Sequence, residues 1–139
     1  MTRSDIEGLL ERHKAAFRRR DAEALADSHA PDGTFESPAH GLVHGRPGIL
    51  GVYRYWLSAF PDLDLSWDSV VVDGARAAFF WTFNGTTAGP FFGVTKPGMR
   101  VTMVGAADYR FAQGYITIAR HVYDFSGVLL KVGVLKARP

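Results

Sequence analysis

The sequence predicts an α+β fold, in which helices of the N-terminal half pack on a strongly curved antiparallel sheet. Apolar residues recur at helical spacing up to about residue 60, and long stretches of alternating apolar and polar residues follow from residue 63. Helices first and antiparallel strands afterwards is the order typical of α+β proteins. The chain has 139 residues and no Cys, so one domain over residues 1–139, held by packing alone, is expected.

Two helices are predicted at the start of the chain. Ser4 and Glu7 have the spacing of a capping box, and apolar residues recur every three or four positions from there to Phe17. Asp21 is a suitable N-cap for a short second helix through Leu25. These two helices supply the first apolar face that the sheet needs.

A turn, a short strand and a third helix are expected next. Residues 31–33 read Pro-Asp-Gly and predict a turn, followed by a short strand over residues 34–37. Residues 39–45 contain two His and two Gly and are predicted to be a loop. Pro47 suits the first turn of a third helix, whose apolar stripe ends at Pro61.

The second half of the chain has the period of a sheet. Asp73-Gly74 is a strong hairpin signal, residues 112–114 predict a second tight turn, and the Gly- and Pro-containing residues 88–98 predict a long loop. The four strands are expected over residues 63–72, 75–87, 100–111 and 115–125. A curved sheet covered by helices encloses a cone whose open end is a natural apolar pocket.

Charge and composition exclude several classes of function. The chain carries 16 Lys and Arg against 14 Asp and Glu, and the net charge of +2 gives no strong field for nucleic acid. Residues 18–20, all Arg, are expected to form the solvated end of a helix. Because neither a membrane-length apolar stretch nor a signal-peptide core is present, a cytoplasmic protein without membrane or nucleic-acid partners is expected. The absence of Cys leaves His and carboxylates as the main candidates for chemistry.

Several short motifs occur in the order and spacing of one family. They are Phe35-Glu36-Ser37-Pro38, Phe60-Pro61-Asp62-Leu63, Trp81-Thr82-Phe83-Asn84-Gly85-Thr86, Pro97-Gly98, Asp108-Tyr109-Arg110-Phe111 and Tyr123-Asp124. Over residues 10–133 the chain resembles the SnoaL-like polyketide cyclases of the nuclear-transport-factor-two-like superfamily. The resemblance implies a cone-shaped α+β barrel, often a homodimer through the sheet, that binds a small hydrophobic molecule. It also implies ring closure by an intramolecular aldol reaction without metal or organic cofactor.

The resemblance indicates two catalytic residues, His121 and Asp108. Asp108 lies where ketosteroid isomerases place a protonated Asp that hydrogen-bonds the substrate oxyanion, and His121 lies, counted from Gly114, where SnoaL-like cyclases carry an acid/base Asp. A turn at residues 112–114 would bring residue 108 opposite residue 118 or 119, and alternation then places both candidates on one face. We therefore expect an Asp–His dyad. The alternatives are a hydrogen-bonded pocket histidine that only shapes ligand binding, and an Asp108 at a strand end that pairs with Arg110 or a backbone group.

The expected substrate-binding residues are aromatic or polar side chains around the predicted pocket. They are Tyr53, Trp56, Trp81, Phe91, Phe92, Arg110, Tyr123, His40 and His44. Phe91 and Phe92 stand in a glycine-flanked loop and suit a lid or a dimer contact, whereas His40 and His44 suit the pocket mouth. His13 and His29 complete the five histidines, but no local metal-ligand pattern is present, so neither a metal nor a cofactor is expected.

Three positions depart from related folds and keep other functions open. Ser37 stands where ketosteroid isomerases carry their general base, Thr87 replaces a His of many relatives, and His121 replaces a carboxylate. Asp124 is expected to act as a structural cap or in a salt bridge. The alternatives to a cyclase are a non-catalytic binding or scaffold protein of the same fold, and an epoxide or lactone hydrolase or isomerase. The hydrolase chemistry usually needs two inward acids that bracket a basic residue.

Overall fold

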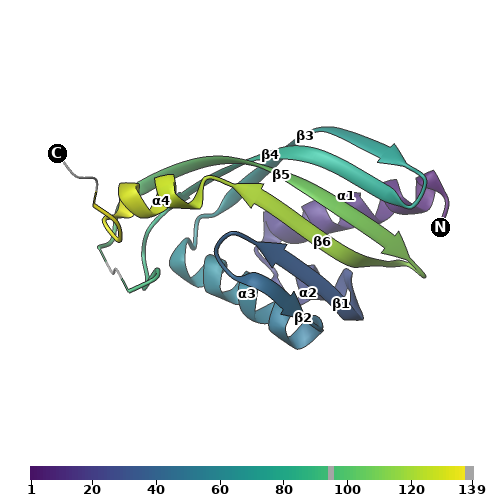
Figure 1. Cartoon of the computed structure of the whole chain (residues 1–139), viewed down its shortest axis with the longest axis horizontal. Helices are drawn as coiled ribbons and strands as arrows, with labels where there is room; N and C mark the ends of the chain where they lie inside the picture. The colour runs from purple at the N-terminus through teal and green to yellow at the C-terminus, as the bar shows by residue number, and fades with distance from the viewer. Residues whose placement is uncertain (94–95, 137–139) are drawn as a thin grey trace.

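The computed structural model describes residues 1–93 and 96–136, which form a curved sheet with helices on one face (Figure 1). The strands are β1 (His29–Ser37), β2 (Gly41–His44), β3 (Asp64–Asp73), β4 (Arg76–Thr86), β5 (Arg100–Ala112) and β6 (Tyr115–Tyr123). They lie in the order β2-β1-β6-β5-β4-β3, and the sheet does not close into a barrel. The predicted α+β class is confirmed. Residues 94–95 of the predicted loop and 137–139 of the predicted domain lie outside the described residues.

All neighbouring strands are antiparallel except β1 and β6, which pair in parallel. The two predicted hairpins are confirmed, since β3 and β4 are joined at Gly74 and β5 and β6 at Gln113 and Gly114. Gly74 and Gly114 have positive φ, which glycine adopts without steric cost. The antiparallel expectation therefore fails only for the crossover between the N-terminal strand and the C-terminal one.

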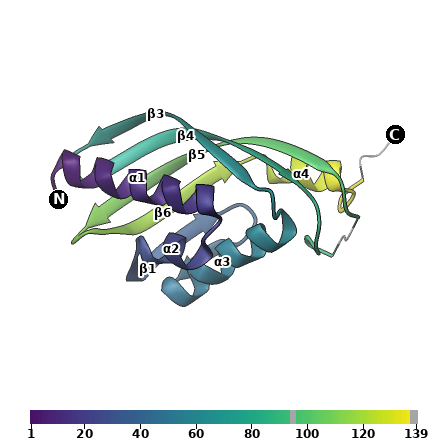
Figure 2. The same ribbon diagram turned by 180° about the vertical axis from the view of Figure 1, so that it is seen from behind.

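Four helices accompany the sheet. They are α1 (Arg3–Arg19), α2 (Ala22–Asp27), α3 (Arg46–Ala59) and α4 (Phe125–Val132). Figure 2 shows α1, α2 and α3 on the face toward which the sheet curves, whereas α4 lies at one end of it. Among the described residues no helix is long and apolar enough to cross a membrane.

The N-terminal cap of α1 differs from the prediction, whereas the cap of α2 is the predicted one. Helix α1 begins earlier than expected, because Thr2 and Asp5, rather than Ser4 and Glu7, form the capping box. Asp21 caps α2 as predicted, with its side chain accepting from the Ala24 N–H at 3.0 Å. A side-chain acceptor at the N-cap satisfies a backbone donor that the helix itself leaves free.

Three local predictions were wrong in extent. The predicted turn at residues 31–33 lies inside β1, where an irregularity between His29 and Thr34 accommodates the extra residues. The predicted loop at residues 39–45 contains β2, which pairs with β1. The last strand ends at Tyr123 instead of residue 125, and the short helix α4 follows it. Asp124 caps α4 by accepting from the Gly127 N–H at 2.9 Å, so its predicted structural role is confirmed.

The core lies between the helices and the inward side chains of β4 and β5. Alternate residues of β4, from Ala77 to Phe83, are buried, and the same alternation holds in β5. Gly105 of β5 makes room for the Trp81 indole, since a Cβ at that position would overlap the ring. The Trp81 ring is thereby laid across the inner face of the sheet, where the pocket begins.

Candidate active site

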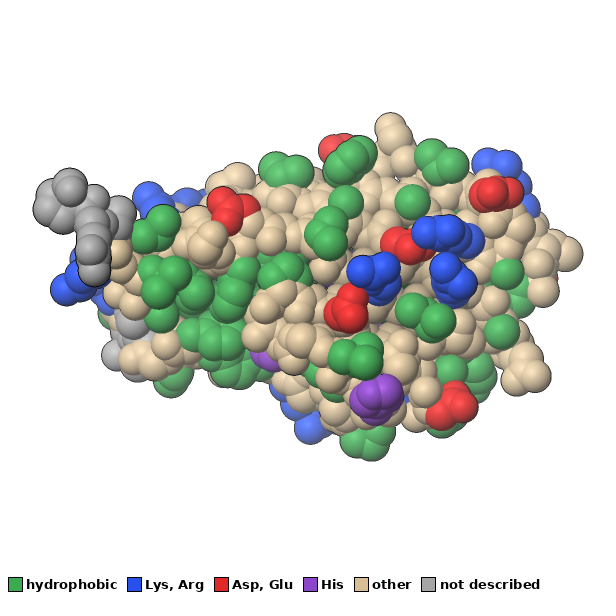
Figure 3. All heavy atoms as spheres, in the orientation of Figure 1, with side chains coloured by type: hydrophobic (Ala, Val, Ile, Leu, Met, Phe, Trp, Pro, Cys, Tyr) green, Lys and Arg blue, Asp and Glu red, His purple; other side chains and the backbone are tan. Residues whose placement is uncertain are grey.

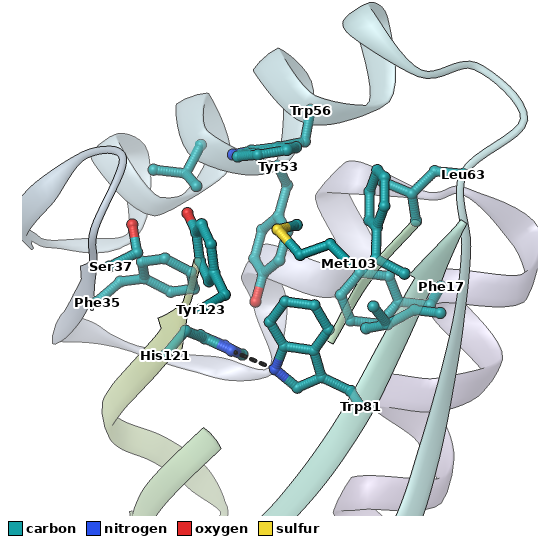
Figure 4. A pocket seen from close by; sticks show the side chains of 13 residues that line it. Phe17, Phe35, Ser37, Tyr53, Trp56, Leu63, Trp81, Met103, His121 and Tyr123 are labelled. Carbon is teal, nitrogen blue, oxygen red and sulfur yellow. Dashed lines mark hydrogen bonds between the residues drawn. The ribbon is translucent and has the colours of Figure 1, made fainter. Parts of the chain in front are cut away.

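A pocket lies between α3 and the inner face of the sheet (Figure 4). It is lined by Phe17, Phe35, Ser37, Val52, Tyr53, Trp56, Leu63, Leu65, Trp81, Phe83, Met103, His121 and Tyr123. None of these lining residues carries a formal charge at neutral pH, since the His121 pKa is lowered to about 4. The cavity volume is about 80 Å³, below the roughly 300 Å³ at which small-molecule pockets usually begin. In this conformation the pocket suits a small, uncharged group.

His121 projects into the pocket from β6 and is hydrogen-bonded at both ring nitrogens. The Trp81 indole N–H donates to Nδ1 at 3.1 Å, and Nε2 lies 2.9 Å from the Tyr109 hydroxyl. An indole nitrogen only donates, so Nδ1 carries the lone pair and the neutral ring carries its proton on Nε2. Nε2–H therefore donates to the Tyr109 oxygen.

Burial determines the protonation state of His121 and of its hydrogen-bond partner Tyr109. Desolvation lowers the pKa of His121 to about 4, because the charged imidazolium is disfavoured away from water. Desolvation also raises the pKa of the Tyr109 phenol. At neutral pH the pair is thus an uncharged imidazole, in its base form, hydrogen-bonded to an intact phenol.

A second buried polar cluster contains Tyr53, His13 and His29. The Tyr53 oxygen lies 2.7 Å from His29 Nε2 and 3.4 Å from His13 Nε2. Both histidines are fully buried, and neither Nδ1 atom has a hydrogen-bond partner among the described residues. Desolvation lowers the pKa of His29 to about 3 and that of His13 well below its ordinary value. Both rings are therefore uncharged at neutral pH.

The structure does not bring Asp108 and His121 together. His121 lies opposite Ala107 in the β5–β6 pair, and Asp108 lies opposite Arg120. The reason is an irregularity between Arg110 and Phe111, which pair with Ile118 and Ile116. The extra residue on β6 shifts the register by one position, and a shift of one position moves a side chain to the other face.

Asp108 therefore belongs to the outer face of the sheet. Its two carboxylate oxygens accept from Arg76 Nε and Nη2, each at 2.8 Å. The hydrogen bonds from Arg76 hold the pKa of Asp108 below its usual value. Figure 3, which looks onto this face, shows basic and acidic side chains interspersed with hydrophobic ones. An ionised, paired carboxylate on this face has no part in an inward dyad.

The predicted binding residues divide into two groups. Tyr53, Trp56, Trp81 and Tyr123 line the pocket together with His121. The other five do not line it; they are Phe91, Phe92, Arg110, His40 and His44.

These five residues lie at three places in the fold. Arg110 on β5 and His44 on β2 are exposed, and Arg110 lies on the outer face for the same register reason as Asp108. His40 is half-buried behind the pocket wall, where its Nε2 accepts from the Trp56 indole at 3.0 Å. Phe91 packs on Trp56, and the Phe92 N–H donates to the Tyr55 hydroxyl at 2.6 Å. The loop that carries Phe91 and Phe92 thus lies against the outer side of the pocket wall.

Eight lining residues were not selected from the sequence, namely Phe17, Phe35, Ser37, Val52, Leu63, Leu65, Phe83 and Met103. Alternation along β4 and β5 predicts inward positions for Phe83 and Met103, and helical spacing predicts Phe17. The cluster of His13, His29 and Tyr53 had no local signal, because its members come from α1, β1 and α3.

The residues that line the pocket do not fit epoxide or lactone hydrolysis. No Asp or Glu lines it among the described residues, so the two inward acids that epoxide or lactone hydrolysis usually needs are not present there. Likewise, the described part of the chain holds no group of three His, Asp or Glu side chains arranged for a metal ion.

Comparisons with known proteins agree with this architecture. The family model described as "SnoaL-like polyketide cyclase" matches residues 7–131. AclR from Streptomyces galilaeus, a candidate hydroxylase, is 26% identical with a TM-score of 0.84, over 99% of this chain and 87% of its own. TsrD from Streptomyces laurentii is 26% identical with a TM-score of 0.81, over 97% and 99%. IdmH from Streptomyces antibioticus, a candidate polyketide cyclase, is 25% identical with a TM-score of 0.76, over 91% and 97%. No curated protein sequence matches the chain.

Proposed function

This chain belongs to the SnoaL-like polyketide cyclase family, and from that premise we propose that it is a cyclase-type enzyme that needs no cofactor. Its substrate is a small, uncharged, mainly apolar carbonyl compound, and His121 is its acid/base group. One observation carries the proposal. His121 is the imidazole that lines an aromatic pocket, held there by Trp81 and Tyr109.

The lining of the pocket supports this class of substrate. Its side chains are apolar except for the hydroxyl groups of Ser37, Tyr53 and Tyr123, the imidazole of His121 and the indole N–H groups of Trp56 and Trp81. A charged ligand would lose its hydration without an opposite charge to replace it, which costs several kcal/mol or more. An uncharged ligand with one or two carbonyl oxygens loses much less.

The proton of the reaction moves at Nδ1 of His121. A ligand that displaces the Trp81 N–H exposes the Nδ1 lone pair to a carbon next to a carbonyl group. The imidazole takes a proton from that carbon, and the imidazolium that forms still donates Nε2–H to Tyr109. The resulting enolate attacks a second carbonyl carbon of the same molecule, a C–C bond forms, and the imidazolium returns its proton to the new alkoxide. Proton transfer by a positioned side chain contributes about 10²–10⁴-fold to such steps.

Hydrogen–deuterium exchange tests this role without knowledge of the natural substrate. Acetophenone has exchangeable protons next to its carbonyl, and NMR in D₂O follows their loss. We expect the protein to accelerate the exchange and His121→Gln, which keeps a polar side chain of similar length, to abolish the acceleration. The matched control is His44→Gln, because His44 is exposed on β2. Equal exchange rates for the unsubstituted protein and His121→Gln would refute the assignment of His121.

The second candidate is a binding protein of the same fold without chemistry. It is favoured by the two hydrogen bonds that occupy both His121 nitrogens, and by a pocket lining to which residues 1–93 and 96–136 contribute no carboxylate. The same experiment separates the two candidates, since binding of acetophenone without any acceleration of exchange supports the binding protein.

A homodimer through the outer face of the sheet is the assembly that we propose. Phe80, Val104 and Val122 are 60%, 62% and 59% exposed and lie on three adjacent strands. Large exposed apolar side chains on neighbouring strands are typical of an interaction surface. A second copy fits this face, because the Arg76–Asp108 and Arg120–Glu36 pairs beside it offer both signs of charge. Light scattering should give twice the chain mass, and Val104→Glu should halve it; a monomeric mass for the unsubstituted protein would refute the dimer.

A further inference from the structure

The cluster of His13, Tyr53 and His29 has no part in the chemistry assigned to His121. It is nevertheless adjacent to that chemistry, because Tyr53 lines the pocket while both histidines lie behind it, fully buried. Figure 4 shows the Tyr53 ring descending from α3 with its hydroxyl directed away from that helix and toward the sheet. The position of the hydroxyl proton decides whether Tyr53 can act on a ligand.

The histidine protons can be placed by accounting for hydrogen bonds. A neutral imidazole carries one proton, on either Nδ1 or Nε2. A proton on Nδ1 of His13 or His29 would be a buried donor without an acceptor, since neither Nδ1 has a partner among the described residues. A buried N–H group without an acceptor costs free energy, and among backbone groups such donors are rarer than acceptors without a partner. Placing both protons on Nε2 pairs both histidine donors with Tyr53 Oη, and the one donor of the cluster then left without an acceptor is the Tyr53 hydroxyl, on a side chain that lines the pocket.

This arrangement leaves the Tyr53 proton free. A phenol oxygen has two lone pairs and one proton, and here the two lone pairs are taken by the histidine N–H groups. Within residues 1–93 and 96–136, the two histidine rings are the only groups hydrogen-bonded to Tyr53 Oη. Its own proton therefore has no acceptor among these residues, and because Tyr53 lines the pocket, a ligand held there can supply one.

We propose that Tyr53 donates this proton in a hydrogen bond to the carbonyl oxygen of the ligand, and that His13 and His29 are positioning residues that hold Tyr53 as a donor. The inference rests on the proposed function, because it assigns a place to the carbonyl group of that ligand. Two N–H groups that donate to the phenol oxygen withdraw charge from it and strengthen its own O–H as a donor. A donor at the carbonyl oxygen stabilises the enolate that forms when His121 removes the neighbouring proton.

A pair of probes isolates the hydrogen bond. Acetophenone carries the carbonyl group, and α-methylstyrene has the same shape with a CH₂ group in place of the oxygen. Their affinities are measured by NMR titration for the unsubstituted protein and for Tyr53→Phe, which removes only the hydroxyl. The control is Tyr115→Phe, the same change at a tyrosine on the protein surface.

We expect Tyr53→Phe to weaken acetophenone binding about 2- to 10-fold, the range of one neutral hydrogen bond, and to leave α-methylstyrene binding unchanged. Tyr115→Phe should change neither affinity. Equal acetophenone affinities for the unsubstituted protein and Tyr53→Phe would refute the inference and leave the proposed function intact. A protein that binds neither probe would refute the proposed function, and the inference would fail with it.

A measurement without any ligand tests the same inference if Tyr53→Phe does not fold. Long-range ¹H–¹⁵N spectra of the ¹⁵N-labelled protein distinguish the two histidine tautomers. We expect His13 and His29 both to carry their proton on Nε2. A proton on Nδ1 of either ring would overturn the assignment, because Tyr53 would then have to donate to that ring instead of to a ligand.

Discussion

The buried histidines make a sharp prediction about acid stability. His13 and His29 are fully buried, and desolvation lowers both pKa values far below the ordinary 6.5. Between pH 7 and pH 5 the folded protein keeps both rings neutral, whereas the unfolded chain protonates them. The unfolded state then binds more protons, so the free energy of unfolding falls as the pH falls.

The size of this loss of stability can be calculated from the pKa of histidine in the unfolded chain, because the folded protein keeps both rings neutral over this pH range. With a pKa of 6.5 for an unfolded histidine, each buried ring costs about 2 kcal/mol of stability between pH 7 and pH 5. His13 and His29 together account for about 4 kcal/mol, a large part of the roughly 5–15 kcal/mol that holds a domain folded. His121, with its pKa lowered to about 4, changes stability in the same direction. The pKa values of Asp62 and Asp108 are also lowered from the ordinary 3.8. These two carboxylates reduce the free energy of unfolding only when the pH falls toward and below that value, outside the range from pH 7 to pH 5.

Urea unfolding at pH 7, 6 and 5 measures this loss. We expect the midpoint to fall steadily while the m value stays constant, and His29→Gln to reduce the difference between pH 7 and pH 5 by about 2 kcal/mol. The matched control is the same substitution at the exposed His44, His44→Gln. A loss of less than about 1 kcal/mol between pH 7 and pH 5 would refute the conclusion that these rings are neutral in the folded protein.

Three substitutions test other parts of the structure. Gly105→Ala adds a Cβ that would overlap the Trp81 ring, and we expect a loss of about 1–3 kcal/mol in urea unfolding, together with an altered tryptophan fluorescence spectrum. Gly51→Ala lies inside α3 with open space around the new Cβ and should instead stabilise the protein by about 0.5–1 kcal/mol, so a destabilised variant would contradict the packing of α3. Asp108→Asn should leave acetophenone binding and exchange unchanged in the NMR assays, because the carboxylate faces outward; a large loss of either would restore Asp108 to the site.

Most of the fold could be read from local patterns. Alternation predicted the long strands, Asp73-Gly74 predicted the first hairpin, and Asp21 predicted a helix start that the structure has. Helix α4 escaped prediction, because its eight residues follow the last strand directly and Phe125 continues the apolar pattern of that strand. Strand β2 escaped because its four residues include Gly41 and are mostly exposed, so they show no alternation.

The site was predicted only in part. The inward position of His121 and the aromatic lining by Trp56 and Trp81 follow from position within single elements. The face of Asp108 depends instead on one extra residue in β6, and counting back from the turn cannot detect it. An irregularity in a ladder is set by how two strands fit each other, which neither strand shows alone.

By itself the sequence determined the class of the fold, the order of its first three helices and four long strands, and the absence of thiol chemistry, because periodicity and composition are local properties of the chain. Only the tertiary structure decided which polar groups meet. It placed Asp108 with Arg76 outside the pocket, and it brought His13, His29 and Tyr53 together from α1, β1 and α3. The physical reason is that hydrogen bonds between distant segments depend on strand register and helix packing, and both are fixed only when the whole chain has folded.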